Sequence, residues 1–156
     1  MESIALTTVI DAKEKRDVLT ADIPNAFVQA HLRPLEKGED RVIMKISGVL
    51  VNLLVKLAPN VYGSFVVYEN KKKILYLEVL QALYGVLVAA LLWYKKLKKD
   101  LEGIGFKFNP YNLCVCNRMV RKKQHTVRFH VDNLMSSHAE KVVNDEFFDW
   151  LNKNYG

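Results

Sequence analysis

Apolar residues recur along this chain with two different periods, and each period predicts one kind of secondary structure. Steps of three and four residues predict a long helix that starts near Gly85 and ends near Gly103 or Gly105. The apolar positions of this helix are Leu87, Ala90, Leu91, Tyr94, Leu97 and Leu101. A weaker stripe of the same period predicts a short helix over residues 3–15.

Alternation of apolar and polar residues, with several β-branched side chains, predicts two hairpins. Their paired strands span residues 64–68 with 73–79, and 114–119 with 126–131. The second hairpin turns within residues 120–125, which form a basic tip. Because successive strand residues point to opposite faces, Arg128, His130 and Asp132 share one face. The opposite face carries Val127, Phe129 and Val131.

Shorter patterns account for much of the remaining chain. Residues 17–22 predict a buried strand that ends at Asp22. Pro24 suits the first turn of a short helix that follows this strand. Residues 33–40 predict a polar loop, and residues 41–46 predict another strand.

Two further segments carry less regular patterns. The apolar run 49–57 fits either a helix or a strand, and residues 59–63 break it. Residues 137–140 read Ser-His-Ala-Glu, which predicts a capping box at the start of a last helix. The apolar face of that helix carries Val143, Phe147, Trp150 and Leu151.

This order of elements predicts an α+β fold, a largely antiparallel sheet with helices packed on one face. A chain of 156 residues is long enough for one domain with a real core, so residues 1–156 are expected to form a single domain. In that fold we expect Asp22 to end a central strand. Asp132 is then expected at the adjacent hairpin bend.

The charge of the chain is compatible with a polyanionic partner but does not require one. Lys and Arg number 23 against 17 Asp and Glu, which gives a net charge of +6. The excess is concentrated in three clusters, Lys71–Lys73, Lys95–Lys99 and Arg118–Lys123. For any one cluster the preferred explanation is structural: a turn, a solvated helix face and a hairpin tip, respectively.

The cysteines indicate a reducing, intracellular setting. Cys114 and Cys116 are too close in sequence for a good disulfide, so we expect buried thiols. A zinc site that combines them with His125 or His130 has no recognised ligand spacing. No stretch reaches the roughly 20 apolar residues of a membrane span, and the N-terminus lacks signal-peptide features, so no membrane association is expected.

Asp22 and Asp132 are the strongest candidates for chemistry, because each ends an apolar, strand-like run. If the fold brings their carboxylates together, they suit hard divalent cations such as Mg²⁺, as in enzymes that use two metal ions. Asn133 stands where a third carboxylate would complete the site. Simpler explanations stay open: Asp22 as a helix N-cap, Asp132-Asn133 as turn residues, and Phe27 and Tyr84 as core aromatics.

Several short motifs occur in an order that resembles the reverse transcriptase domain of copia-type retrotransposons, over essentially all 156 residues. The first is the segment Asp22 to Phe27, which matches the pattern D-x-x-x-A-F. The others are Leu83-Tyr84-Gly85, Trp93-Tyr94, Gly105-Phe106-Lys107, Cys114-Val115 and His130-Val131-Asp132-Asn133. The last one corresponds to Y-V-D-D in that family. The resemblance implies a polymerase-palm-like antiparallel sheet.

The resemblance also implies roles for particular residues. Asp22 and Asp132 would hold two Mg²⁺ or Mn²⁺ ions, with Asn133 at the third catalytic position. Phe27 would lie under the incoming sugar, and Tyr84 and Gly85 against the nascent base pair. The implied partners are an RNA or DNA primer-template, a deoxynucleoside triphosphate and the rest of the retrotransposon polyprotein. The implied setting is the cytoplasm or a virus-like particle.

The chain also departs from the family pattern. Asn133 replaces an Asp, His130 replaces a Tyr, and residues 86–90 replace a polar, proline-containing stretch. The resemblance covers the palm and part of the fingers, with thumb and ribonuclease H segments expected beyond residue 156. These departures leave a second interpretation open, an inactive domain that binds nucleic acid. In either case Arg121, Lys122 and Lys123 at the basic hairpin tip are candidate contacts to phosphate.

Overall fold

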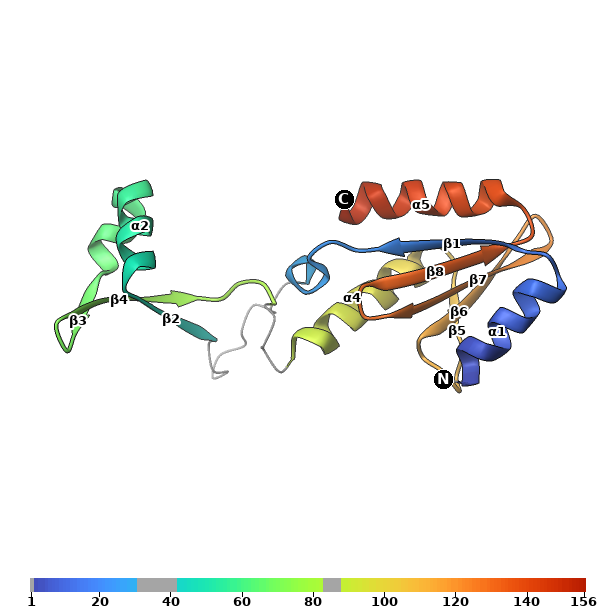
Figure 1. Cartoon of the computed structure of the whole chain (residues 1–156), viewed down its shortest axis with the longest axis horizontal. Coiled ribbons are helices and arrows are strands. Elements are labelled where there is room, and N and C mark those ends of the chain that lie inside the picture. Colours follow the sequence, from blue (N-terminus) through green and yellow to red (C-terminus); the bar gives the residue numbers. More distant parts are fainter. Residues whose placement is uncertain (1, 31–41, 83–87) are drawn as a thin grey trace. The chain divides into compact units, whose positions relative to one another are not determined.

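The computed structural model describes residues 2–30, 42–82 and 88–156, with the side chains of residues 2–4 left aside (Figure 1). The chain forms two compact units. The large unit comprises residues 1–31 and 82–156, and the small unit comprises residues 32–81. The predicted α+β fold with antiparallel sheets is confirmed. The polar loop predicted at 33–40, Tyr84 and Gly85 lie outside the described residues.

The large unit is built on a five-stranded antiparallel sheet with the order β1-β8-β7-β6-β5. Its strands are β1 (Asp17–Asp22), β5 (Lys107–Phe108), β6 (Val115–Val120), β7 (Lys123–His130) and β8 (Asn133–His138). Its helices are α1 (Glu2–Lys13), the 3₁₀ helix η1 (Ala26–Gln29), α4 (Ala89–Gly103) and α5 (Lys141–Tyr155). None of the helices in the described ranges is both long and apolar enough to cross a membrane.

Two helices, α4 and α5, cover one face of this sheet (Figure 1). The apolar face predicted for α5 points into this layer, where Phe147 is almost completely buried. Among its described residues, the stripe predicted for α4 is fully buried only at Leu97 and Leu101. Ala90 and Leu91 are exposed, and Ala89 and Trp93 are buried instead. The buried residues of both helices meet the apolar face of β7, which carries Val127 and Phe129. Burial of these side chains is the main source of stability for the large unit. The core members from the helices are Ala89, Trp93, Leu97, Leu101, Phe147, Leu151 and Tyr155.

Helix α1 covers part of the opposite face, so helices pack on both sides of the sheet. Its anchor is an ion pair between Asp11 and Arg128 of β7, at 3.3 Å. Both side chains are less than 10% exposed, at 7% and 9%. Arg128 also donates a hydrogen bond to the Thr7 hydroxyl of α1. A buried pair of this kind holds two elements in register but leaves a costly charge if one partner is lost.

A chain of buried hydrogen bonds links the sheet to α5. Arg118 Nε donates to His125 Nδ1 at 3.2 Å, and His125 Nε2 donates to Ser136 Oγ at 2.7 Å. Ser136 donates in turn to Asn144 at 2.8 Å, and the Asn144 amide reaches the Asp17 carboxylate at 2.7 Å. Burial, and then the neighbouring Arg118 charge, lower the pKa of His125 to about 3. His125 is therefore a neutral structural residue at physiological pH.

Residues 137–140 do not form the predicted capping box. Ser137 and His138 are the last residues of β8, a strand with no prediction of its own. Glu140 precedes α5 but makes no side-chain cap hydrogen bond. The buried residues of β8 include Ser136, Ser137 and His138, so the strand lacks the apolar alternation that identifies a strand in sequence.

Strand β1 has the predicted bounds but not the predicted burial. It is an edge strand among the described strands rather than a central one. Val18, Thr20 and Asp22 are exposed, and the residues between them are only partly buried. The short helix after it begins at Ala26 rather than at Pro24, because Asn25 takes a left-handed conformation with φ 52°.

The chain leaves and rejoins the large unit at one backbone hydrogen bond. The amide of Ala82 donates to the carbonyl of Ala30 at 2.9 Å. Both alanines are buried in the core of the large unit. The small unit is therefore an insertion between two adjacent points of the large unit.

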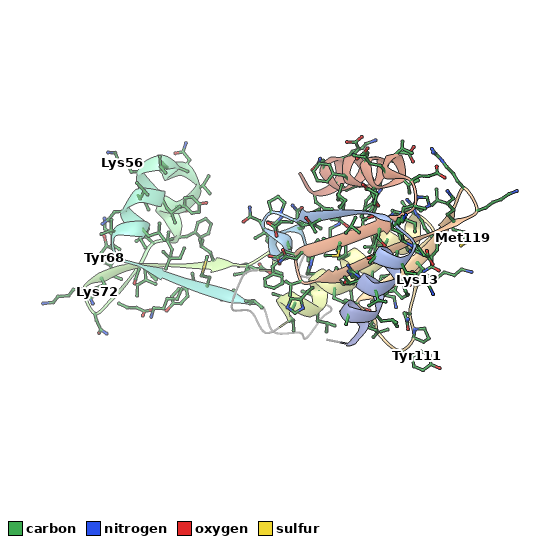
Figure 2. All side chains as sticks on the ribbon, turned by 45° about the vertical axis from the view of Figure 1, so that its right-hand side comes forward. Lys13, Lys56, Tyr68, Lys72, Tyr111 and Met119 are labelled. Carbon is green, nitrogen blue, oxygen red and sulfur yellow. The ribbon has the colours of Figure 1, made fainter. Side chains whose placement is uncertain are left out.

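The small unit has a three-stranded sheet of order β2-β4-β3 and a compact core of Ile46, Val51 and Leu75. Its strands are β2 (Ile43–Ser47), β3 (Val67–Glu69) and β4 (Lys72–Glu78), and its helices are α2 (Val49–Leu57), α3 (Pro59–Tyr62) and the 3₁₀ helix η2 (Gly63–Phe65). The ambiguous run 49–57 is thus a helix, and the predicted hairpin forms as β3 and β4. Tyr68 and Lys72 project from that hairpin in Figure 2.

Candidate active site at one end of the large sheet

The turn between β7 and β8 carries Asp132. His130 and Asn133 pair with each other, so Val131 and Asp132 form a two-residue hairpin turn between them. Val131 adopts a φ of 58°, which is uncommon for a β-branched residue. The predicted position of Asp132 at a hairpin bend is confirmed.

The strand register brings Asp22 to the same end of the sheet. Asp22 at the end of β1 pairs with Asn133 at the start of β8. Asn133 also pairs with His130, so these three residues form one row across β1, β8 and β7. Residues that pair directly across antiparallel strands share a face, so the three side chains lie on the α1 face of the sheet. Two segments more than a hundred residues apart in sequence thus meet at one row.

A backbone hydrogen bond joins Asp132 to the segment that follows Asp22. The amide of Ile23 donates to the carbonyl of Asp132 at 3.0 Å. The Asn133 side-chain amide donates to Asp132 Oδ1, also at 3.0 Å. Asp22 and Asn133 are exposed and Asp132 is partly buried, so solvent reaches all three polar groups. The expected meeting of the two aspartate segments is therefore present.

A cavity of about 690 Å³ lies on the same face, beside this row. Its floor consists of the row of Asp22, Asn133 and His130 and of the next row, Thr20, Met135 and Arg128. The remaining lining residues are Ala21, Asn112, Cys114, Val115, Phe129 and Leu134. Strand alternation correctly places Arg128 and His130 on one face, but it does not reveal that they line a cavity. The contribution of Cys114 and Asn112 has no signal in the sequence.

The other candidates for substrate contacts are less well defined. Phe27 lies in η1, is partly buried and packs against the core cluster of the large unit. It is not among the residues that line the cavity. Tyr84 and Gly85 lie outside the described residues. The roles assigned to these three residues remain predictions.

The basic hairpin tip lies at the far end of β7 from the aspartates. Arg121 and Lys122 form the turn between β6 and β7, with φ values of 50° and 62°. Since β7 starts at Lys123 and ends at His130, roughly 25 Å separate the two turns. The tip and the candidate site cannot contact the same nucleotide.

Acidic side chains already pair with two of the three basic residues at that tip. Arg121 contacts both Glu140 and Glu146 at 3.2 Å. Lys123 also lies 3.2 Å from Glu140. Hydrogen bonds from Lys123 and Arg121 lower the pKa of the Glu140 carboxyl. These ion pairs reduce the positive charge that the tip can offer to a phosphate.

The two cysteines differ in their surroundings, contrary to the prediction that both are buried. Cys116 is buried in the core, and burial raises the pKa of its thiol to about 12. Cys114 is exposed and lies at the cavity wall. Both are free thiols. Within the described residues, no group of three or more His, Cys, Asp or Glu side chains is arranged to hold a metal ion.

Comparisons with protein-family models, with curated proteins and with solved structures found no match to this chain. The arguments about function therefore depend on the order of the sequence motifs and on the geometry of the site. Of the residues assigned to that site, the structure brings together Asp22, Asp132 and Asn133. It adds His130 and Arg128 as neighbours at the cavity.

Proposed function

We propose that this chain is the palm and part of the fingers of a copia-type reverse transcriptase. The reaction is template-directed attack of a primer 3′-hydroxyl on the α-phosphate of a deoxynucleoside triphosphate. The single observation that carries the proposal is the register of β1 and β8, which pairs Asp22 with Asn133, directly beside Asp132. The order of motifs in the sequence supports the same assignment.

The side chains at this end of the sheet fit a magnesium or manganese site with a reduced donor set. Mg²⁺ often binds through one or two carboxylates and completes its shell with water and substrate phosphates. Asp22 and Asp132 supply two carboxylates, and Asn133 supplies a neutral amide where the family has an acid. When bound, the metal ions would neutralise charge on the phosphates and lower the pKa of the attacking hydroxyl. We expect weaker metal binding than with three acids.

The remaining residues of the site would position the nucleic acid. The exposed row of Asp22, Asn133 and His130 would give the primer end access to the Asp22 carboxylate. The cavity beside the row has space and apolar wall for a sugar or base. Phe27 would exclude a ribose 2′-hydroxyl, as the resemblance implies. The net charge of +6 would favour association with the phosphate backbone.

A second candidate function is nucleic-acid binding without catalysis. It is favoured by the hydrogen bond from the Asn133 amide to Asp132 Oδ1. That bond occupies a carboxylate oxygen with a neutral donor and fixes the amide with its NH₂ group toward Asp132. A site in this form has less negative charge for dications than the family pattern provides.

Calorimetric titration with Mn²⁺ tests the proposal directly. Wild-type protein is expected to bind Mn²⁺, Asp22→Asn to lose that binding, and Asn133→Asp to bind more tightly because it adds a carboxylate. Asp149→Asn is a matched control, since Asp149 is an exposed acid on α5. Equal Mn²⁺ affinity of the wild type and Asp22→Asn would show that Asp22 is not a metal ligand.

Primer extension separates the two candidate functions. Under the proposal, Asn133→Asp extends a primer on an RNA template with Mn²⁺, and the added change Asp22→Asn abolishes the extension. Retention of labelled primer-template by every variant, with no extension by any of them, would favour the second candidate. Loss of both binding and extension in all variants would rule out both.

A further inference from the structure

Trp93 is a core residue of the large unit whose one polar group, the indole N–H, contacts the candidate site. The side chain is 2% exposed and packs edge-to-face on Tyr155, with ring centroids 5.5 Å apart. Its Nε1–H donates to the carbonyl oxygen of Val131 at 2.6 Å. A buried indole N–H usually finds an acceptor, but here the acceptor belongs to the turn that carries Asp132.

That turn has an unfavourable backbone conformation. Val131 has a φ of 58°, and a β-branched side chain in this left-handed region is strained. Strained residues of this kind persist only when the surrounding structure fixes them. The hydrogen bond from Trp93 is one of the contacts that fix Val131.

Asp132 lies between two peptide groups that are each held by another element. The peptide before it is held by Trp93 of α4, through the Val131 carbonyl. The peptide after it is held by the Ile23 amide, which donates to the Asp132 carbonyl at 3.0 Å. Because the two flanking peptide planes set φ and ψ of Asp132, they also set the direction of its Cα–Cβ bond. The Asn133 amide then restrains the carboxylate itself at 3.0 Å.

We infer that Trp93 is a positioning residue for the aspartate pair: its indole N–H fixes the strained turn and so aims the Asp132 carboxylate at the site shared with Asp22. This role rests on the proposed metal-binding function of the two carboxylates. It assigns a task to Trp93 that is separate from its contribution to the core. The task depends on one N–H group, so it can be removed while most of the ring is kept.

Trp93→Phe removes this N–H and keeps an aromatic ring against Tyr155. Loss of an outer contact that orients a metal ligand costs about 10-fold to 100-fold in metal affinity, and we expect about 10-fold weaker Mn²⁺ binding in calorimetry. We also expect faster hydrogen exchange of the Ile23 amide, because its acceptor is in the same turn. This second measurement requires no metal.

Trp150→Phe is the matched control. Trp150 of α5 packs against the same core cluster, so its replacement also removes an indole from this unit. Mn²⁺ affinity and Ile23 exchange are expected to stay at wild-type values in this control. If both variants weaken Mn²⁺ binding equally, the effect is a general loosening of the core and the positioning role is wrong.

A rescue variant distinguishes positioning from packing. Asn adopts left-handed conformations far more readily than Val, so Val131→Asn is expected to keep the turn in shape without help from Trp93. Adding Val131→Asn to Trp93→Phe should therefore restore most of the Mn²⁺ affinity. A defect caused by lost core packing would not respond to a change in the turn, and absence of rescue would contradict the inference.

Hydrogen exchange in the wild-type protein tests the inference even if Trp93→Phe fails to fold. One opening of the turn releases both the Trp93 indole proton and the Ile23 amide proton, so both are expected to show the same opening free energy after each rate is corrected for the exchange rate of the unprotected group. Unrelated opening free energies would overturn the inference. If wild-type protein binds no Mn²⁺ at all, the proposed function fails, while the exchange data still decide whether Trp93 holds the turn.

Discussion

The two hairpin turns at the ends of β7 have the same length and are held in different ways. The turn at Arg121 and Lys122 has two residues with positive φ and is held at the surface by ion pairs to α5 and its N-terminus. The turn at Val131 and Asp132 has a strained valine and is held from the core by Trp93. One turn depends on exposed charges and the other on a buried donor.

This difference indicates which turn has a fixed shape. Exposed ion pairs contribute little to stability and weaken as salt rises. A buried hydrogen bond is not screened by salt, and losing it leaves an unsatisfied polar group in the core. The conformation of the turn at Val131 and Asp132 is therefore the more firmly fixed of the two. That is the property a metal-binding carboxylate requires.

The largest expected effect on stability comes from removing the ion-pair partner of Arg128, which lies in β7 between the two turns. Asp11→Leu leaves the buried Arg128 charge unpaired and is expected to cost about 3–5 kcal/mol of unfolding free energy in urea titration. The double variant Asp11→Leu with Arg128→Met is expected to recover most of that stability, because no buried charge remains. A double variant as unstable as the single one would show that the packing of α1, not the ion pair, holds this strand.

A smaller, pH-dependent effect sharpens the contrast between the two ends of β7. The pKa of buried His125, near the basic turn, is lowered to about 3, whereas an unfolded histidine takes up a proton near pH 6.5. The unfolded state therefore binds the extra proton between these values, and stability falls as pH decreases from 6.5 toward 3. The loss is at most about 1.4 kcal/mol per pH unit.

Urea titrations between pH 7 and pH 4.5 measure this effect. His125→Asn is expected to flatten the pH dependence, although it lowers stability at neutral pH. An unchanged slope in His125→Asn would mean that carboxylates alone account for acid destabilisation.

The smallest effect compares the two turns directly. Val131→Asn relieves left-handed strain and is expected to stabilise the protein by about 1 kcal/mol, as measured by urea titration. Lys122→Asn at the other turn relieves less, since Lys is unbranched at Cβ, and a change within about 0.5 kcal/mol is expected. Equal gains at both turns would show that Val131 is no more strained than an ordinary turn residue.

Periodic segments of the fold are predictable from the sequence, and segments with buried polar residues are not. The existence of helix α4 and of both hairpins is predicted correctly from the apolar patterns. Their details differ: Ala89 and Trp93 are buried in place of Ala90 and Leu91, and the tip predicted at 120–125 is a two-residue turn at 121–122. Strand β8 is missed because Ser136, Ser137 and His138 fill buried positions that an apolar pattern would mark. These residues are stabilised by hydrogen bonds across the sheet and to α5, and such partners are visible only in three dimensions.

The candidate site likewise has features that the sequence predicts and features that it does not. The proximity of Asp22 and Asp132 is predictable, because each ends a strand-like run and an antiparallel sheet can align such ends. The contact between Trp93 and Val131 is not predictable, because it depends on how α4 crosses the sheet. The exposed position of Cys114 at the cavity is not predictable either, because it depends on the conformation of the loop before β6.

The hydrogen bond between Ala30 and Ala82 has a consequence for how this chain tolerates changes in length. It closes the large unit into a continuous body at the point where the small unit departs and returns. A change in the length of the inserted segment 31–81 is therefore expected to act on the sheet and core of the small unit itself. The row of Asp22, Asn133 and His130 should keep its place, because the residues that position it belong to the large unit.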